Sequence, residues 1–374
     1  MSSQKKTAVM YGAGNIGRGF IGQVFHDSGF EVVFIDINEK VVSALNKRGA
    51  YTQLIIDENS VEEREICFIR AVDGRNRDAV IHEIAVCDIL AVSVGAAVLP
   101  RIAPLLADGL VQREKTLNIL VCENLVHAPD VLRGLVSDYL PDSSMPGRVG
   151  FVGATIGRMV PVIPPEQRDN DPTLIAVERF CLLPVDGDAV ISPMPVLKHT
   201  ILCSPFAFEE GKKLYIHNMG HSLAAYLGAL KGFDFIWQIM DDKALLSTVQ
   251  GAMGASADAL AQKYSEDRDD LSRYVDDLLS RFGNKGLGDT VARVGGDPLR
   301  KLAPGDRFMG TVDLCKEQGV DYSPVLSGIS AALRFDAPDD PSAGLLRKML
   351  EENGVSAFLR NYCGLSEEDA TRCL

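Results

Sequence analysis

A cluster of glycines in the pattern GxGxxG occupies residues 12–17, directly after the apolar run 7–11. Between a buried strand and a helix, the first glycine permits a tight turn, the second lets the backbone approach a pyrophosphate, and the third lets the helix pack on the strand. A second apolar run, 31–35, is followed by Asp36, whose carboxylate suits ribose hydroxyls and repels the 2′-phosphate of NADP. The pattern predicts an NAD site made by Gly12, Ala13, Gly14, Asn15, Ile16, Gly17 and Asp36. A glycine turn that binds nothing, or one that binds a flavin, is the alternative.

The first third of the chain alternates apolar runs with helix-like segments, which is typical of a parallel sheet with right-handed crossovers. We expect strands at 7–11, 31–35, 84–94 and 117–122, and helices at 20–28 and 38–47, the second capped by Asn38. Prolines crowd residues 140–210, where short strands such as 174–180 are expected to extend the sheet. After residue 214 apolar residues recur at helical spacing, and helices are expected at 221–230, 241–264, 269–282, 324–333 and 344–352.

These patterns predict an α/β fold with a Rossmann-like doubly wound parallel sheet and a mainly helical C-terminal domain. The boundary between the two domains is expected near residue 200, where the proline-rich stretch ends. This division gives an NAD-binding domain with its sheet extension at 1–200 and a helical substrate domain at 201–374.

The chain is acidic, with a net charge of −13. Its average field repels polyanions, so we expect neither nucleic acid nor an anionic membrane as a partner. The eight cysteines form no CxxC pair and have no metal-ligand spacing with the six histidines, which predicts reduced thiols and no metal site. No apolar stretch reaches the roughly 20 residues of a membrane span, and no signal peptide is evident. A cytoplasmic protein is therefore expected, and a homo-oligomer is compatible with the sequence.

Two further residues follow expected strands. Gly95 comes after the apolar stretch 84–94, at the edge of the sheet where the nicotinamide half of a dinucleotide passes; a plain turn is the alternative. Asn124 follows the expected strand 117–122, and its amide can reach the same edge. This amide can donate a hydrogen bond to a substrate oxygen, or Asn124 can cap the following segment as an N-cap. On spacing alone the two interpretations of Asn124 have about equal weight.

Lys213, Asn218 and His221 form a third cluster, in a segment with a helical pattern. At about 100° per residue, His221 lies about 60° from Asn218 and about 80° from Lys213, so all three can face one side of a helix. A lysine, an amide and an imidazole on one surface can take a proton from an alcohol and hold the oxygen as negative charge develops, without a metal. A solvated helix face with a partly buried histidine is the more common meaning of such a cluster.

Several segments together resemble the polyol-specific long-chain dehydrogenases, the family of the mannitol dehydrogenases and of the fructuronate and tagaturonate reductases. The resemblance spans roughly residues 7 to 333, and it is carried by Gly12–Gly22, Cys122–Asn124, Lys213 with Asn218 and His221, Pro298–Leu302, and Asp306–Arg307. The family implies a Rossmann domain followed by a largely helical domain. It also implies metal-free, NAD-dependent interconversion of a polyol and a ketose.

The resemblance also implies residue roles. Lys213 is the general acid/base, Asn124 and Asn218 hold the reacting oxygen, and His221 orients the substrate. The chain is compact, like the members of the family that act on sugar phosphates. The resemblance therefore implies a reaction that interconverts mannitol 1-phosphate and fructose 6-phosphate. A hexuronate reductase or a free-polyol dehydrogenase of the same family is the alternative, and a non-catalytic NAD-binding sensor is a remote one.

A phosphorylated substrate requires positive charge gathered locally in so acidic a chain. The candidates in the helical domain are Arg281, Arg300 and Lys301. The pair 300–301 is favoured, because it lies in a segment that carries the resemblance and because a guanidinium can grip phosphate with two hydrogen bonds. Surface ion pairs with neighbouring aspartates are the alternative for each of the three.

Overall fold

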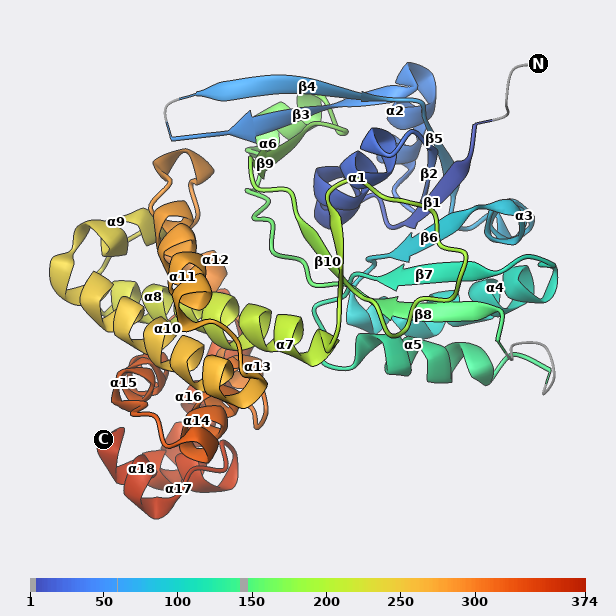
Figure 1. Cartoon of the computed structure of the whole chain (residues 1–374). Coiled ribbons are helices and arrows are strands. Elements are labelled where there is room, and N and C mark those ends of the chain that lie inside the picture. The colour runs from blue at the N-terminus through green and yellow to red at the C-terminus, as the bar shows by residue number, and fades with distance from the viewer. Residues whose placement is uncertain (1–4, 59, 142–146) are drawn as a thin grey trace. The chain divides into compact units, whose positions relative to one another are not determined.

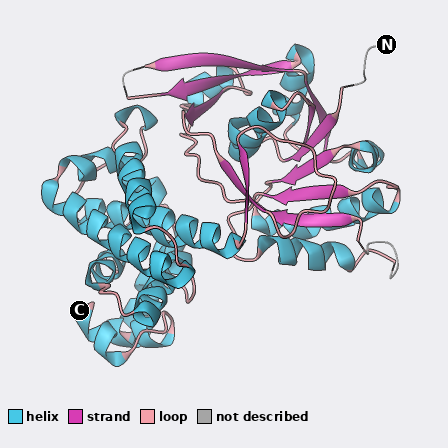
Figure 2. Ribbon diagram, viewed as in Figure 1, coloured by secondary structure: helices cyan, strands magenta, loops and turns pink. Residues whose placement is uncertain are grey.

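The structure, a computed structural model of the chain, describes residues 5–58, 60–141 and 147–374. It divides into two compact units, Met1–Glu209 and Glu210–Leu374, and Figure 1 labels their helices and strands where there is room. Figure 2 shows that the strands of the described residues lie in the first unit, whereas the second is built from helices.

A six-stranded sheet forms the centre of the first unit. Its strands are β1 (Thr7–Tyr11), β2 (Glu31–Asp36), β5 (Ile69–Asp73), β6 (Ile89–Val92), β7 (Leu117–Val121) and β8 (Val149–Gly153). They lie in the order β5-β2-β1-β6-β7-β8, and each neighbouring pair is parallel. The order reverses between β1 and β6, and doubly wound sheets bind ligands at the carboxyl ends of their strands at such a point. The predicted Rossmann-like sheet is therefore confirmed.

Helices cover both faces of this sheet. One face carries η1 (Gly17–Ile21), which is a π-helical turn, α1 (Gly22–Asp27) and α2 (Glu39–Arg48). The other face carries α3 (Arg77–Val86), the short turn η2 (Ala96–Val98), α4 (Leu99–Val111) and α5 (Ala128–Ser137). Each face has its own apolar core. The predicted cap of α2 is confirmed, because the Asn38 side chain accepts a hydrogen bond from the Val41 N–H.

A second, smaller sheet belongs to the same unit. It contains β3 (Ala50–Ile56), β4 (Val61–Cys67) and β9 (Ile175–Glu178), while β10 (Leu183–Asp186) and β11 (Thr200–Cys203) pair separately and α6 (Pro165–Asn170) precedes β9. β3 and β4 form an antiparallel hairpin, and β9 runs parallel to β3. The prediction that 174–180 extends the main sheet is therefore wrong, because its strand residues pair with β3.

The expected strand at 84–94 is wrong over its first residues. Residues 84–86 end α3, and β6 begins only at Ile89. Ile84 is fully buried and packs against Gly109 of α4. A short apolar run is found in buried helices as well as in buried strands. The apolar residues at the end of α3 therefore resemble the start of a strand in the sequence.

β3 braces the turn η1. Tyr51 Oη and Gln53 Nε2 both donate hydrogen bonds to the Arg18 carbonyl oxygen, at 2.7 and 2.8 Å. The buried Arg18 side chain donates from Nε to the Ala13 carbonyl at 2.6 Å and from Nη1 to the Pro172 carbonyl at 3.1 Å. The chain that follows β1 is thus held by hydrogen bonds to β3 and to the segment before β9.

The second unit is an assembly of helices that follows α7 (Phe206–Gly211). It contains the π-helical turn η3 (Lys212–Asn218), α8 (Met219–Leu230), α9 (Ile236–Asp241), α10 (Lys243–Tyr264), α11 (Arg268–Phe282), η4 (Lys285–Leu287), α12 (Val291–Gly295), α13 (Pro298–Lys301), α14 (Arg307–Gln318), α15 (Ser323–Ala332), α16 (Pro341–Asn353), α17 (Val355–Asn361) and α18 (Glu367–Arg372). α8 is buried along most of its length. Of the described helices, none has the length and apolar character to cross a membrane.

The last 41 residues, 334–374, are tied to the rest of this unit by side-chain contacts. Tyr362 Oη donates a hydrogen bond to the Leu299 carbonyl at 3.1 Å. Asp369, which is 2% exposed, accepts a hydrogen bond from Tyr322 Oη at 2.9 Å and pairs with Lys316 Nζ at 2.5 Å. The charge of Lys316 and these hydrogen bonds hold the pKa of Asp369 below its usual range against the opposing effect of burial. These contacts anchor α18 to the helices before it.

Candidate active site

The glycine loop joins β1 to η1 at the carboxyl end of the strand. Gly12 has a φ of +106°, and a Cβ at this position would overlap the Ser93 carbonyl. A Cβ at Gly17 would overlap the Gly12 carbonyl, so the absent side chain lets the helix start close to the strand. A Cβ at Gly14 would meet nothing within 4 Å. The open side of Gly14 is where the backbone can approach a diphosphate.

Asp36 ends β2 beside this loop. Its Oδ2 accepts a hydrogen bond from the Ala13 N–H at 2.7 Å, and its Oδ1 accepts one from the Asn38 N–H at 2.9 Å. Asn15, which is exposed, and Ile16, which is half-buried, open the helical segment. The structure therefore brings the loop and the carboxylate together, and the two fit the pyrophosphate and the ribose of a dinucleotide.

A second set of contacts joins the ends of β6 and β7. Glu123 Oε1 accepts hydrogen bonds from the Val94 N–H at 2.7 Å and the Gly95 N–H at 3.0 Å. Burial raises the pKa of Glu123, although these two hydrogen bonds oppose the rise. No sequence motif indicates these two contacts of Glu123, because its partners lie 28 and 29 residues away. The Gly95 turn, with a φ of +90°, is thus tied to the residue that precedes Asn124.

Asn124 is exposed and lies in the turn after β7. Its side chain makes no hydrogen bond with any residue that the structure describes. The next helix, α5, begins at Ala128, and its N-cap is His127. The interpretation of Asn124 as an N-cap is therefore wrong, and its amide is available to a ligand.

The segment that holds Lys213 and Asn218 is a π-helical turn. In η3 the Met219 N–H donates to the Leu214 carbonyl, five residues back. A π-helix has more residues per turn than an α-helix, so residues five apart lie closer to one side of it, whereas they are about 140° apart in an α-helix. The turn therefore brings Lys213 and Asn218 to one side of the chain more closely than the expected α-helix does. Extra turns of this kind occur frequently at functional sites.

Of the two histidines near this segment, His217 is buried and His221 is largely buried. His217 is 2% exposed and the His221 side chain is 14% exposed, so the segment is not a solvated helix face. Burial lowers the pKa of His217 well below its ordinary value, and nearby positive charges, those of Lys213, Arg281 and Arg307 among them, lower it further. Lys213 also lowers the pKa of His221. Lys213 is itself half-buried.

The three phosphate candidates lie in different surroundings. Lys301 is 4% exposed and donates to the Val294 and Gly296 carbonyls; burial and then neighbouring arginines lower its pKa to about 7. Arg300 is exposed and donates to Asp297 at 2.7 Å. The Arg281 side chain is only 11% exposed. Of the three, Arg281 is the one whose charge acts on the buried His217.

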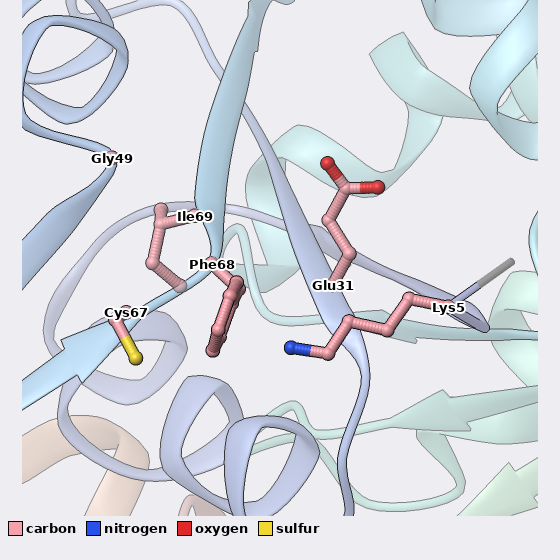
Figure 3. A pocket seen from close by; sticks show the side chains of 6 residues that line it. All are labelled: Lys5, Glu31, Gly49, Cys67, Phe68 and Ile69. Carbon is pink, nitrogen blue, oxygen red and sulfur yellow. The ribbon is translucent and has the colours of Figure 1, made fainter. Parts of the chain in front are cut away.

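The pocket in Figure 3 lies away from the glycine loop. It has a volume of about 560 Å³ and is lined by Lys5, Glu31, Gly49, Cys67, Phe68 and Ile69. Lys5 precedes β1, Glu31 begins β2 and Ile69 begins β5, so the pocket lies at the amino ends of the strands, opposite the edge that binds dinucleotides. In the described part of the chain, no three His, Cys, Asp or Glu side chains gather as metal ligands.

Two family models match the chain. The mannitol dehydrogenase Rossmann domain matches residues 6–199, and the mannitol dehydrogenase C-terminal domain matches residues 206–362. The second match continues beyond residue 333, so the likeness to the family extends further than the sequence motifs indicated. It includes α16 and α17.

Individual proteins agree with these matches. A mannitol-1-phosphate 5-dehydrogenase of Exiguobacterium sibiricum is 36% identical over 365 residues, which are 97% of this chain and 94% of that protein. The ternary complex of Pseudomonas fluorescens mannitol 2-dehydrogenase with NAD and D-mannitol has a TM-score of 0.79 at 16% identity, over 100% of this chain and 91% of the other. A substrate-free D-sorbitol dehydrogenase has a TM-score of 0.73 at 17% identity, over 88% and 80%. At such identities the two solved structures show a shared fold.

Proposed function

The chain belongs to the mannitol dehydrogenase family, and from this membership we propose that it is an NAD-dependent dehydrogenase that interconverts mannitol 1-phosphate and fructose 6-phosphate. The observation that carries the choice of substrate is the 36% identity, along nearly the whole of both chains, with a protein named mannitol-1-phosphate 5-dehydrogenase. The open side of Gly14 and the carboxylate of Asp36 support the choice of a dinucleotide cofactor.

The first unit supplies the residues that hold the cofactor. The loop 12–17 binds the pyrophosphate, Asp36 binds the adenosine ribose, and the Gly95 turn, with Glu123 behind it, faces the nicotinamide half. When bound, NAD supplies a nicotinamide ring that accepts a hydride from the alcohol carbon or returns one to the ketose carbon.

The second unit supplies the acid/base chemistry. Lys213 removes the hydroxyl proton as the alcohol is oxidised and returns it in the reverse direction. The Asn218 amide donates a hydrogen bond to the same oxygen as negative charge develops there. Asn124 is the second amide donor that the family resemblance implies, and His221 orients the substrate hydroxyls.

The function is tested by the initial rate of NADH oxidation with a panel of ketoses. We expect the highest kcat/KM with fructose 6-phosphate. Equal use of fructose would identify a free-polyol dehydrogenase, and preference for fructuronate or tagaturonate would identify a hexuronate reductase. Tight NADH binding without turnover of any of the four ketoses would identify a non-catalytic sensor.

We expect wild type to prefer NAD(H) over NADP(H), and Asp36→Ala to narrow that preference. The carboxylate attracts ribose hydroxyls and repels a 2′-phosphate, and the variant lacks both effects. The measurement is kcat/KM with each cofactor. Glu39→Ala, which removes an exposed carboxylate three residues further on, is the control and should leave the preference unchanged. A wild-type preference for NADPH would refute the role of Asp36.

We expect Arg281→Ala to raise the KM for fructose 6-phosphate roughly tenfold or more, because a charge-assisted hydrogen bond contributes about 1.5–3 kcal/mol. The KM for fructose should change little, since it lacks the phosphate. Arg300→Ala is the matched control: both arginines pair with an aspartate, but Arg300 is exposed whereas Arg281 is largely buried. A larger effect of Arg300→Ala would move the phosphate site to the pair 300–301, and equal effects on both ketoses would exclude a phosphate contact at Arg281.

A further inference from the structure

His221 has a largely buried carboxylate, that of Asp289, as its partner. The Asp289 side chain is 10% exposed, and its Oδ2 lies 2.9 Å from His221 Nε2, an ion-pair distance whose direction is not that of a well-aligned hydrogen bond. Its other oxygen, Oδ1, accepts hydrogen bonds from the Arg293 guanidinium, at 2.9 Å from Nε. Asp289 thus lies between the imidazole and a cation, and each carboxylate oxygen contacts a different partner.

The backbone fixes the position of Asp289. Its carbonyl accepts a hydrogen bond from the Ile236 N–H at 2.9 Å, and the Val291 N–H donates to the Asp234 carbonyl at 2.8 Å. These bonds flank a β-bridge between Phe235 and Thr290. The segment that connects η4 to α12 is therefore tied to the start of α9, and the carboxylate approaches His221 from a rigid support.

The plane of the imidazole is fixed as well. The Phe282 ring, 3% exposed, stacks on His221 with a centroid distance of 4.6 Å and an angle of 10° between the planes. A ring that is stacked on one side and contacted by a carboxylate at Nε2 has little freedom to rotate. Nε2 lies 2.9 Å from Asp289 Oδ2, which leaves Nδ1 as the nitrogen for another partner.

The charges around His221 determine its protonation. Burial lowers the pKa of His221 below its ordinary value; Asp289 opposes the shift, while Arg293 and Lys213 add to it. The His217 ring lies 6.2 Å from that of His221, and it is buried with its pKa well below the ordinary value. At neutral pH the imidazole is therefore neutral. The carboxylate favours the tautomer with the proton on Nε2, so that Nδ1 carries a lone pair.

We propose that Asp289 is a positioning residue that orients His221 and selects its Nε2–H tautomer, so that Nδ1 accepts a hydrogen bond from a substrate hydroxyl. This inference rests on the proposed function of His221 as a substrate-orienting residue. Asp289 acts through the imidazole and does not touch the substrate, in the way that a carboxylate orients an imidazole in other sites.

A double-mutant cycle on kcat/KM for fructose 6-phosphate tests the proposal. Asp289→Asn, which keeps the shape and removes the charge, should lower kcat/KM about tenfold or more in the wild-type background. The same change should alter kcat/KM less than about twofold when His221 is already Gln. An equal loss in both backgrounds would overturn the proposal. Asp241→Asn, which removes an exposed carboxylate paired with Lys285, is the matched control and should leave the rate unchanged.

NMR of the ¹⁵N-labelled histidine rings gives a readout independent of turnover. In wild type we expect the proton of neutral His221 on Nε2, and its absence from that nitrogen would overturn the proposal even if Asp289→Asn does not fold. In the folded variant the titration midpoint of His221 should move to lower pH, because the carboxylate that favours the imidazolium is gone. An unshifted midpoint would also overturn it. A wild type that reduces no ketose would refute the proposed function and leave this NMR test standing.

Discussion

Replacement of Lys213 by alanine is expected to lower kcat by a factor of roughly 10² to 10⁴, the range that general acid/base catalysis supplies. The variant loses the only group to which we assign the transfer of the hydroxyl proton. NADH affinity should stay within about twofold of wild type, because the glycine loop and Asp36 belong to the other unit. The loss should therefore appear in kcat and not in cofactor binding.

The comparison that makes this result specific uses the neighbouring lysine. Lys212 lies over the Tyr274 ring at 5.0 Å, and Lys212→Ala removes the same charge one residue away while keeping the proposed base. Stopped-flow rates and NADH fluorescence titrations are measured for both variants, with and without EDTA. Near-normal turnover by Lys213→Ala, or inactivation by EDTA that zinc reverses, would refute the metal-free lysine mechanism.

Replacement of Gly14 by valine is expected to weaken NADH binding about 100-fold, a change of about 2.7 kcal/mol, with the thermal midpoint of unfolding unchanged. A Cβ at this position meets nothing within 4 Å, so the fold has room where the side chain begins. A bound pyrophosphate would clash with the added methyl groups, because it has to lie close to the backbone at this position.

Gly17→Ala provides the contrasting case. Its Cβ overlaps the Gly12 carbonyl, so this variant should lose stability as well as affinity, visible as a lower thermal midpoint. Isothermal titration with NADH and differential scanning calorimetry separate the two effects. If Gly14→Val binds NADH as tightly as wild type, the dinucleotide lies elsewhere and the glycine turn is structural.

The sequence predicted those parts of the fold that depend on local patterns. The glycine cluster, the strand 7–11, the Asp36 position and the Asn38 cap each depend on residues close together in the chain, and each is found as predicted. The strand at 175–178 was predicted too, but its partner was not, because pairing with β3 joins residues more than 100 positions apart. Alternation alone does not state which sheet a strand joins.

The candidate site shows the same limit. The spacing of Lys213, Asn218 and His221 was visible, but the π-helical turn was not, because no residue type marks an i→i+5 turn. The contact between His221 and Asp289 joins positions 68 residues apart, so only the folded chain reveals it. Lys301 lies in a segment whose sequence indicated a phosphate ligand, yet its ammonium group donates hydrogen bonds to backbone carbonyls.

The brace on the Arg18 carbonyl bears on the entropy of cofactor binding. Tyr51 and Gln53 hold that carbonyl, and the Arg18 side chain holds Ala13 in the glycine loop. A loop that already has its bound shape loses little conformational freedom when a ligand arrives, and this preorganisation raises affinity without adding a contact. Substitutions in β3, a strand with no place in the proposed cofactor contacts, can therefore tune how tightly the dinucleotide is held.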